Sequence, residues 1–147
     1  YISEVYAIAG NYRSPAALEE FPDFYDNVLL SARFINGAQG SLSGAQGVQY
    51  GYDSRVEILG THGIIHVGRK DEYSVLTINP EGIQTPYVKS WRTLFLDAYF
   101  EEDLAFIRAI LDKSPPLVTG LDGLEAVRVV NAGNRSIRER RPITIKR

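Results

Sequence analysis

Two histidines, His62 and His66, are the residues most readily associated with catalysis or metal binding, and they are the only histidines among 147 residues. On a helix, a spacing of four would let them share a metal ion, but they flank a turn at Gly63 that leads into an expected strand. Positions i and i+4 of a strand lie about 13 Å apart on one face, too far for one ion. We therefore interpret both as turn or surface histidines. They also complete no Ser-His-Asp arrangement.

Three consecutive carboxylates, Glu101, Glu102 and Asp103, raise the possibility of paired acids for glycoside chemistry. Neighbouring residues of a helix point about 100° apart, so three in a row cannot converge on one substrate. We interpret them as a solvated helix face. The chain also has no cysteine, which excludes thiolate metal sites, disulfides and cysteine nucleophiles. We therefore expect no catalytic residue and no metal ligand within this chain.

Glycines do not form a nucleotide-binding turn. A dinucleotide site needs a glycine-rich turn between a strand and a helix. Gly37, Gly40, Gly44 and Gly47 fall in expected hairpins instead, and no Walker-type lysine loop is present. We therefore expect no cofactor-binding residue here. The net charge of −2 also predicts no nucleic-acid partner and no attraction to an anionic membrane.

Aromatic residues are more suggestive. Tyr50-Gly51-Tyr52-Asp53 places two phenols on one side of an expected extended segment, and the glycine between them leaves room for a ligand or for backbone. Trp91 precedes the first expected helix, and Tyr99 lies inside it. An aromatic wall with hydroxyl tips suits a polyol or sugar, because apolar ring faces stack and phenols form hydrogen bonds. Ordinary core packing of the same aromatic residues is the alternative that their types and spacing leave open.

The elements that must position these residues are mostly short strands with alternating polarity. The expected strands are 2–9, 28–35, 38–46, 52–59, 64–67, 73–78, 83–88 and 143–146. Asn36-Gly37 predicts a type I′ hairpin turn, which needs a positive φ at both central residues. Short strands joined by tight turns predict a largely antiparallel sheet.

Helical periodicity appears late in the chain. An apolar stripe spaced i, i+4, i+7 and i+11 predicts a helix over about 94–112, which Pro115-Pro116 stop. A second helix is expected over about 122–138, with Asp122 as its cap and Glu125 reaching back in a capping box. The fold class is therefore α+β: an open-faced, mostly antiparallel β-sheet with two main helices packed on one face.

The predicted sheet has more surface than two helices can cover. Its other face must stay open or meet another chain, which points to a homo-oligomer. The longest apolar stretches are about eight residues, well short of the roughly 20 that a membrane-spanning helix needs. Because the chain begins at Tyr1, inside an apolar alternation, and contains no methionine, we expect it to be cut from a longer protein.

An ordered series of segments then carries a resemblance along nearly the whole chain. The segments are Asp26-Asn27, Phe34–Gly40, Tyr50–Gly63, Asp97–Tyr99 with Phe106, Pro116–Ala126, and Ser136 with Arg141–Ile143. Their order and spacing resemble the C-terminal domain of the glucose–fructose oxidoreductase, inositol dehydrogenase and rhizopine-catabolism (Gfo/Idh/MocA) family. The resemblance implies that residues 1–147 form a single C-terminal domain for substrate binding and oligomerisation.

In that family an N-terminal Rossmann domain binds NAD or NADP and carries a Glu-Lys-Pro lysine, and a later Asp-x-x-x-His segment handles the substrate proton. Neither pattern occurs here. The resemblance therefore implies an isolated chain without activity, a cytoplasmic parent dehydrogenase, and the absent N-terminal domain as a partner. It also implies pocket roles for Tyr50, Tyr52, Trp91 and Tyr99 toward a cyclic polyol or sugar, inositol-like by preference.

Two alternatives stay open from the sequence. The chain could be a non-catalytic carbohydrate-binding or assembly module, or part of an NAD-dependent glycosidase branch of the same family. The identity of the sugar, the choice between NAD and NADP, and the choice between dimer and tetramer also stay open.

Overall fold

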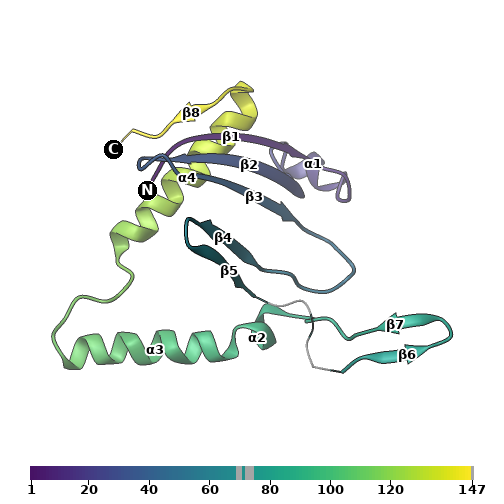
Figure 1. The fold of residues 1–147 in the computed structure, drawn as a ribbon. Coiled ribbons are helices and arrows are strands. Elements are labelled where there is room, and N and C mark those ends of the chain that lie inside the picture. The colour runs from purple at the N-terminus through teal and green to yellow at the C-terminus, as the bar shows by residue number, and fades with distance from the viewer. Residues whose placement is uncertain (69–70, 72–74, 147) are drawn as a thin grey trace. The chain divides into compact units, whose positions relative to one another are not determined.

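The computed structural model describes residues 1–68, 71 and 75–146, which divide into two compact units (Figure 1). The first unit combines Tyr1–Gly47 with Pro115–Arg147, and the second is Val48–Ser114. The two ends of the chain therefore belong to one unit, and the Tyr-Gly-Tyr-Asp segment belongs to the other.

The first unit contains a four-stranded sheet in the order β3-β2-β1-β8, in which every neighbouring pair is antiparallel. Its strands are β1 (Ile2–Gly10), β2 (Asn27–Phe34), β3 (Gln39–Ala45) and β8 (Ile143–Thr144). A short helix, α1 (Ala17–Glu20), lies in the connection from β1 to β2. The expected α+β class with an open, mostly antiparallel sheet is confirmed.

The turn between β2 and β3 differs from the predicted type. Gly37 has φ +87°, but Asn36 has no positive φ, so this is not a type I′ turn. Instead the Gly37 N–H donates to the Phe34 carbonyl at 3.0 Å and the Phe34 N–H donates to the Ala38 carbonyl at 2.8 Å. This is a three-residue loop with a glycine bulge, in which only the last loop position needs a left-handed residue.

The helix α4 (Gly120–Glu139) covers one face of this sheet, as Figure 1 shows. Side chains alternate along the strands, so Val5 and Ala32 point toward the helix and are buried. They form the core with Ala132 and Ile143. Gly133 lets the helix approach closely, since a Cβ at this position would lie 3.2 Å from the Leu30 Cδ1 atom.

Ser136 connects the helix to the sheet through its hydroxyl group and is fully buried. Its Oγ accepts from the Ala7 N–H at 2.9 Å and donates to the Arg141 carbonyl at 2.7 Å. The short strand β8 pairs only with Glu4 and Val5, so the Ser136 hydroxyl supplies the partner that the Ala7 amide requires further along β1. The same hydroxyl fixes the chain after the left-handed residue Arg140, whose φ is +53°.

The N-terminus of α4 lies earlier than predicted. Thr119 is the N-cap, and its backbone N–H and hydroxyl donate to the Asp122 carboxylate at 2.7 and 2.8 Å. Asp122 is therefore the third helical residue and not the cap, and Glu125 pairs with Arg128 instead of closing a capping box. The sequence pattern fits both registers, because Thr119 and Asp122 have the same three-residue spacing as Asp122 and Glu125.

Asp26 organises the connection that follows β1. Its buried carboxylate accepts from the backbone N–H groups of Tyr12, Arg13 and Ser14 at 2.6 to 3.1 Å. Burial by itself raises the pKa of the Asp26 carboxyl, but these amide donors, with the positive charge of Arg13, outweigh it and leave the pKa below its usual value.

The second unit contains two hairpins and two helices. They are β4 (Val56–Gly60) with β5 (Gly63–Val67), β6 (Thr77–Asn79) with β7 (Gly82–Gln84), α2 (Trp91–Leu94) and α3 (Leu96–Leu111). The strands expected at 52–59, 73–78 and 83–88 are therefore shorter than predicted, and the strand expected at 64–67 begins one residue earlier. Residues 73–74 lie outside the described residues. Helix α3 matches the prediction, and Lys113, with φ +52°, precedes the two prolines. Among the described residues, none of the helices is both long and apolar enough to cross a membrane.

We predict that Ser136→Ala lowers the free energy of unfolding by about 1–3 kcal/mol, the cost of leaving buried polar groups without a partner. The variant would orphan the Ala7 amide and the Arg141 carbonyl. Chemical denaturation monitored by circular dichroism measures the change. Ser41→Ala, at an exposed position of β3, is the control, with an expected change within about 0.5 kcal/mol. Equal stability of the two variants would contradict the assigned role of Ser136.

We predict that Asp26→Asn lowers the melting temperature at neutral pH, because an amide NH2 cannot accept the backbone donors that now converge on the carboxylate. A depressed folded-state pKa stabilises the fold above the unfolded-state pKa, and this contribution is lost as pH falls through the folded value. The difference between wild type and variant should therefore shrink below about pH 4. Thermal melts between pH 7 and pH 2 test this, with the exposed neighbour Asp23→Asn as control. A difference that does not vary with pH would refute the explanation.

Candidate functional site

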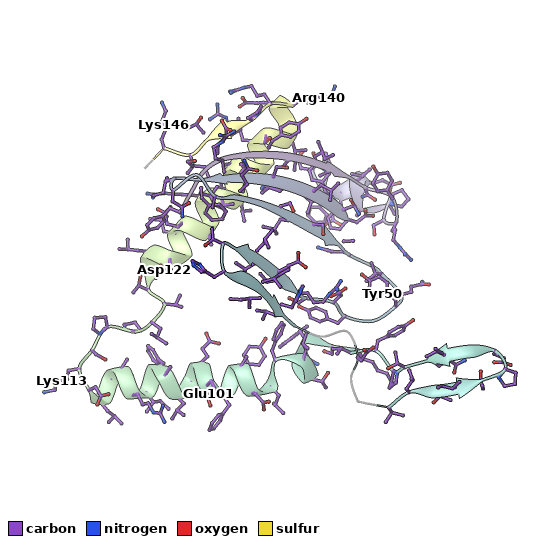
Figure 2. The ribbon with its side chains drawn as sticks, viewed as in Figure 1. Tyr50, Glu101, Lys113, Asp122, Arg140 and Lys146 are labelled. Atoms are coloured by element: carbon purple, nitrogen blue, oxygen red, sulfur yellow. The ribbon has the colours of Figure 1, made fainter. Side chains whose placement is uncertain are left out.

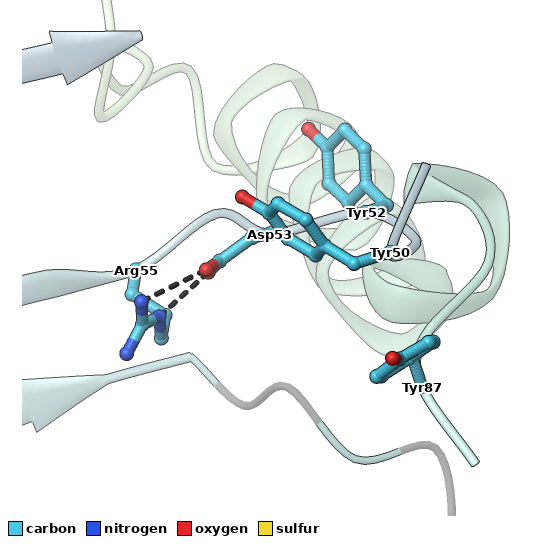
Figure 3. Close-up of a pocket in the computed structure, with 5 residues that line it drawn as sticks. All are labelled: Tyr50, Tyr52, Asp53, Arg55 and Tyr87. Atoms are coloured by element: carbon cyan, nitrogen blue, oxygen red, sulfur yellow. Dashed lines mark hydrogen bonds and ion pairs between the residues drawn. The ribbon is translucent and has the colours of Figure 1, made fainter. Parts of the chain in front are cut away.

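A pocket of about 360 Å³ lies in the second unit (Figure 3). Its lining residues are Tyr50, Tyr52, Asp53, Arg55 and Tyr87. Four of them come from the segment that leads into β4, and Tyr87 comes from the segment that precedes α2. The structure therefore brings both predicted tyrosines of the Tyr-Gly-Tyr-Asp motif to one concave surface.

The glycine of this motif is required by a close backbone contact. Gly51 has φ +116°, and a Cβ there would lie 2.6 Å from the Val88 carbonyl oxygen. The neighbouring Tyr52 N–H donates to the same oxygen at 2.7 Å. Val88 itself is buried. The space beside Gly51 is therefore filled by backbone and not by a ligand. This backbone contact holds Tyr50 and Tyr52 against the Tyr87 segment.

Asp53 and Arg55 form a bidentate ion pair at the pocket (dashed lines in Figure 3). The Arg55 Nε and Nη2 atoms lie 2.6 and 2.8 Å from the two carboxylate oxygens. The side chain of Asp53 is 18% exposed and that of Arg55 48% exposed. The hydrogen bond to Asp53 raises the pKa of Arg55, so the guanidinium is positively charged and its charge is balanced locally.

Beside the pocket, four aromatic rings form a continuous edge-to-face series. Tyr52 meets Phe95 at 6.2 Å between ring centroids, Phe95 meets Tyr99 at 6.5 Å, and Tyr99 meets Trp91 at 5.9 Å. The interplanar angles lie between 79° and 86°, the arrangement that aromatic quadrupoles favour. The Arg92 guanidinium lies 5.1 Å from the Trp91 ring centroid. Three of the four predicted site residues therefore belong to one cluster, and Tyr52 joins this cluster to the pocket.

Helices α2 and α3 place the last three rings of the series. Ser90 caps α2, since its side chain accepts from the Arg92 N–H, and the helix breaks at Phe95 before α3 begins. Trp91, Phe95 and Tyr99 follow one another at intervals of four residues, which keeps them on neighbouring turns. Trp91 is therefore the first residue of a short helix rather than part of a loop, and Tyr99 lies in the first turn of α3.

Four residues at the site were not predicted as site residues: Asp53, Arg55, Tyr87 and Phe95. The spacing of Phe95 from both Trp91 and Tyr99 was a usable signal, because i and i+4 are neighbours on a helix. No sequence signal indicated Tyr87, because it reaches the pocket through a backbone contact between segments that are far apart in the sequence. Tyr50, Trp91 and Tyr99 remain between 42% and 50% exposed, as side chains available to a ligand are. Their role in substrate binding stays a prediction.

The histidines and the acidic triplet lie outside the pocket. The His62 Nδ1 atom lies 2.9 Å from the Thr61 hydroxyl in the turn between β4 and β5, and His66 pairs with Glu57 across that hairpin. The triplet starting at Glu101 is exposed on α3 (Figure 2). In the described part of the chain, no group of three or more His, Asp or Glu side chains has a geometry that could hold a metal ion.

The model of an oxidoreductase family, the C-terminal alpha/beta domain of Gfo/Idh/MocA proteins, matches residues 2–145. The chain belongs to this family. The family expected from the ordered sequence segments is confirmed.

Curated and solved relatives of this Gfo/Idh/MocA domain include inositol dehydrogenases. It is 30% identical over 122 residues to myo-inositol 2-dehydrogenase from Thermotoga maritima, which is 82% of this chain and 36% of that relative. It is 26% identical to scyllo-inositol 2-dehydrogenase (NAD(+)) from Bacillus subtilis, over 97% of this chain and 42% of the relative. The crystal structure of a myo-inositol dehydrogenase from Corynebacterium glutamicum matches with a TM-score of 0.90 and 26% identity, over 99% of this chain and 44% of that one. The Gfo/Idh/MocA domain thus spans less than half the length of these relatives.

Proposed function

We propose that this chain is the substrate-pocket and oligomerisation domain of an NAD(P)-dependent oxidoreductase that acts on a cyclic polyol, inositol-like by preference. The observation that carries the proposal is the joining of Tyr52, Trp91 and Tyr99 in one ring series beside a tyrosine-lined pocket. The names of the curated relatives, which include myo- and scyllo-inositol 2-dehydrogenases, support the substrate class.

The chemistry of these side chains fits a polyol. The C–H faces of a cyclic polyol stack on aromatic rings, while its hydroxyls need donors and acceptors, which phenols provide. In this proposal Tyr50 and Tyr52 form hydrogen bonds to substrate hydroxyls, and Trp91 and Tyr99 form an apolar wall. The chain therefore binds and orients the substrate, and the parent enzyme oxidises a secondary alcohol carbon.

The residues of this chain do not fit NAD(P). Neither long helix in the described ranges follows a strand through a glycine-rich turn: α3 follows α2 directly, and α4 begins after the 115–116 prolines. The first turn of α4 also carries the Asp122 carboxylate, which would repel a pyrophosphate. We therefore propose that NAD or NADP is bound mainly by an N-terminal domain outside this chain.

The open face of the four-stranded sheet supports a homo-oligomer. Opposite α4, the strands present Tyr6, Ile8 and Leu29, which are 41%, 52% and 51% exposed. These side chains lie next to one another on β1 and β2 and line a shallow groove with Ser31 and Ser43. An exposed sheet face with such an apolar patch suits a second copy of the same chain.

We predict that Tyr52→Phe in the full-length protein lowers kcat/KM for inositol oxidation about three- to tenfold, the loss of one hydrogen bond. Tyr12→Phe, at a 79% exposed position of the first unit, should leave kcat/KM unchanged. NAD(P)H absorbance measures the rates, and melting temperatures identify any loss of stability. A lower melting temperature with unchanged kinetics would favour simple aromatic packing.

The isolated chain serves as a second comparison in the same assay. It should show no turnover with NAD(P) and inositol, because the proton-handling segment and the cofactor domain lie elsewhere. Strong sugar binding by the isolated chain, together with an inactive full-length protein, would instead favour a carbohydrate-binding module.

We predict that Ile8→Glu weakens self-association of the full-length protein at least about thirtyfold, because an unpaired charge buried in an interface costs about 2 kcal/mol or more. Sedimentation equilibrium measures the dissociation constant. The control Leu18→Glu introduces the same charge on α1, at a 40% exposed position. Unchanged association of the Ile8 variant would exclude the open sheet face as the interface.

A further inference from the structure

Among the described residues, the lining of the pocket carries two opposite charges. They belong to Asp53 and Arg55, and the other three lining residues are tyrosines. Lys89 and Arg92 are close in sequence to Tyr87 but do not line the pocket, and Arg92 stacks on Trp91 instead. The electrostatic character of the pocket therefore depends on how the one ion pair is arranged.

The geometry of this pair makes Arg55 a poor anion receptor. A guanidinium binds phosphate or carboxylate best through two parallel N–H donors. Here the Nε and Nη2 donors both point to Asp53, at 2.6 and 2.8 Å. An incoming anion would have to displace the carboxylate or share the guanidinium with it at close range, where like charges repel.

The partial burial of Asp53 makes that displacement costly. Its side chain is only 18% exposed, against 48% for Arg55, so the carboxylate cannot turn freely into water to make room. Moving the carboxylate away would break its bidentate pair with Arg55 at a side chain that is mostly shielded from water. Uncharged hydroxyl groups carry no such penalty, and they can bond to the outward-facing donors of the guanidinium and to the tyrosine hydroxyls.

We propose that Asp53 is a specificity-determining residue: by occupying the Arg55 guanidinium it makes the pocket accept uncharged polyols and reject their phosphorylated or carboxylated counterparts. This inference rests on the proposed function, because it concerns the same pocket. Beyond the proposed function, it specifies that the substrate is uncharged and that Asp53 selects for this property. Specificity of this kind comes from repulsion of the wrong ligand and not only from contacts with the right one. Here the Asp53 carboxylate would repel an anionic ligand that approaches Arg55.

The test is a comparison of myo-inositol with a myo-inositol monophosphate on the full-length protein. Isothermal titration calorimetry gives both dissociation constants, and NAD(P)H absorbance gives turnover. Wild-type protein should bind the uncharged polyol more tightly than the phosphate ester. Asp53→Asn should shift the affinity ratio toward the ester by roughly tenfold, the contribution of one charge-assisted interaction. Asp53→Ser is a second variant in case the amide destabilises the segment.

Asp97→Asn is the matched control, because it removes the same charge from the first turn of α3 without touching the pocket. It should leave the ratio unchanged. Equal or tighter binding of the ester by wild type, or an unchanged ratio in both Asp53 variants, overturns the inference even if myo-inositol is oxidised. Conversely, a shifted ratio in a protein that oxidises no polyol overturns the proposed function and leaves the charge selection standing.

Discussion

Buried backbone N–H and C=O groups that form no helix or sheet hydrogen bond need another partner. Three contacts of this kind organise the described part of the chain. The Ser136 hydroxyl meets the Ala7 amide where β8 has ended. The Asp26 carboxylate collects three amides of the connection after β1. The Val88 carbonyl accepts from Tyr52 across the glycine of the pocket motif. Each contact fixes a segment that secondary structure alone would leave undefined.

The third contact, between Tyr52 and Val88, shapes the candidate pocket. It holds the Tyr50 and Tyr52 segment against the Tyr87 segment, so a pocket forms without either tyrosine lying in a strand. Phe95 then joins Tyr52 to the helix-borne rings of Trp91 and Tyr99. A wall assembled from two separate segments is a suitable surface for a rigid cyclic polyol, since the rings are positioned before the ligand arrives.

The two units differ in their surfaces, and their proposed roles differ accordingly: the second binds substrate and the first associates with another copy. In the second unit, the described lining of the pocket pairs Asp53 with Arg55 and is rich in phenols, which suits an uncharged hydroxylated ligand. In the first unit, the sheet face opposite α4 exposes the apolar side chains of Tyr6, Ile8 and Leu29, which suits association. Both features agree with membership of the Gfo/Idh/MocA family and with a chain that spans less than half of its relatives' length.

Local sequence determined the α+β class, the antiparallel pairing, helix α3 and the family, because periodicity, turn residues and motif order are read over short distances. It also predicted a common pocket role for Tyr50, Tyr52, Trp91 and Tyr99. Tertiary structure decided the rest. The first turn of α4 could start at either of two equally spaced pairs, and only packing and the Thr119–Asp122 bonds select one. Likewise Tyr87 enters the pocket, and Gly51 is required, through a backbone contact between segments more than thirty residues apart, which no local pattern encodes.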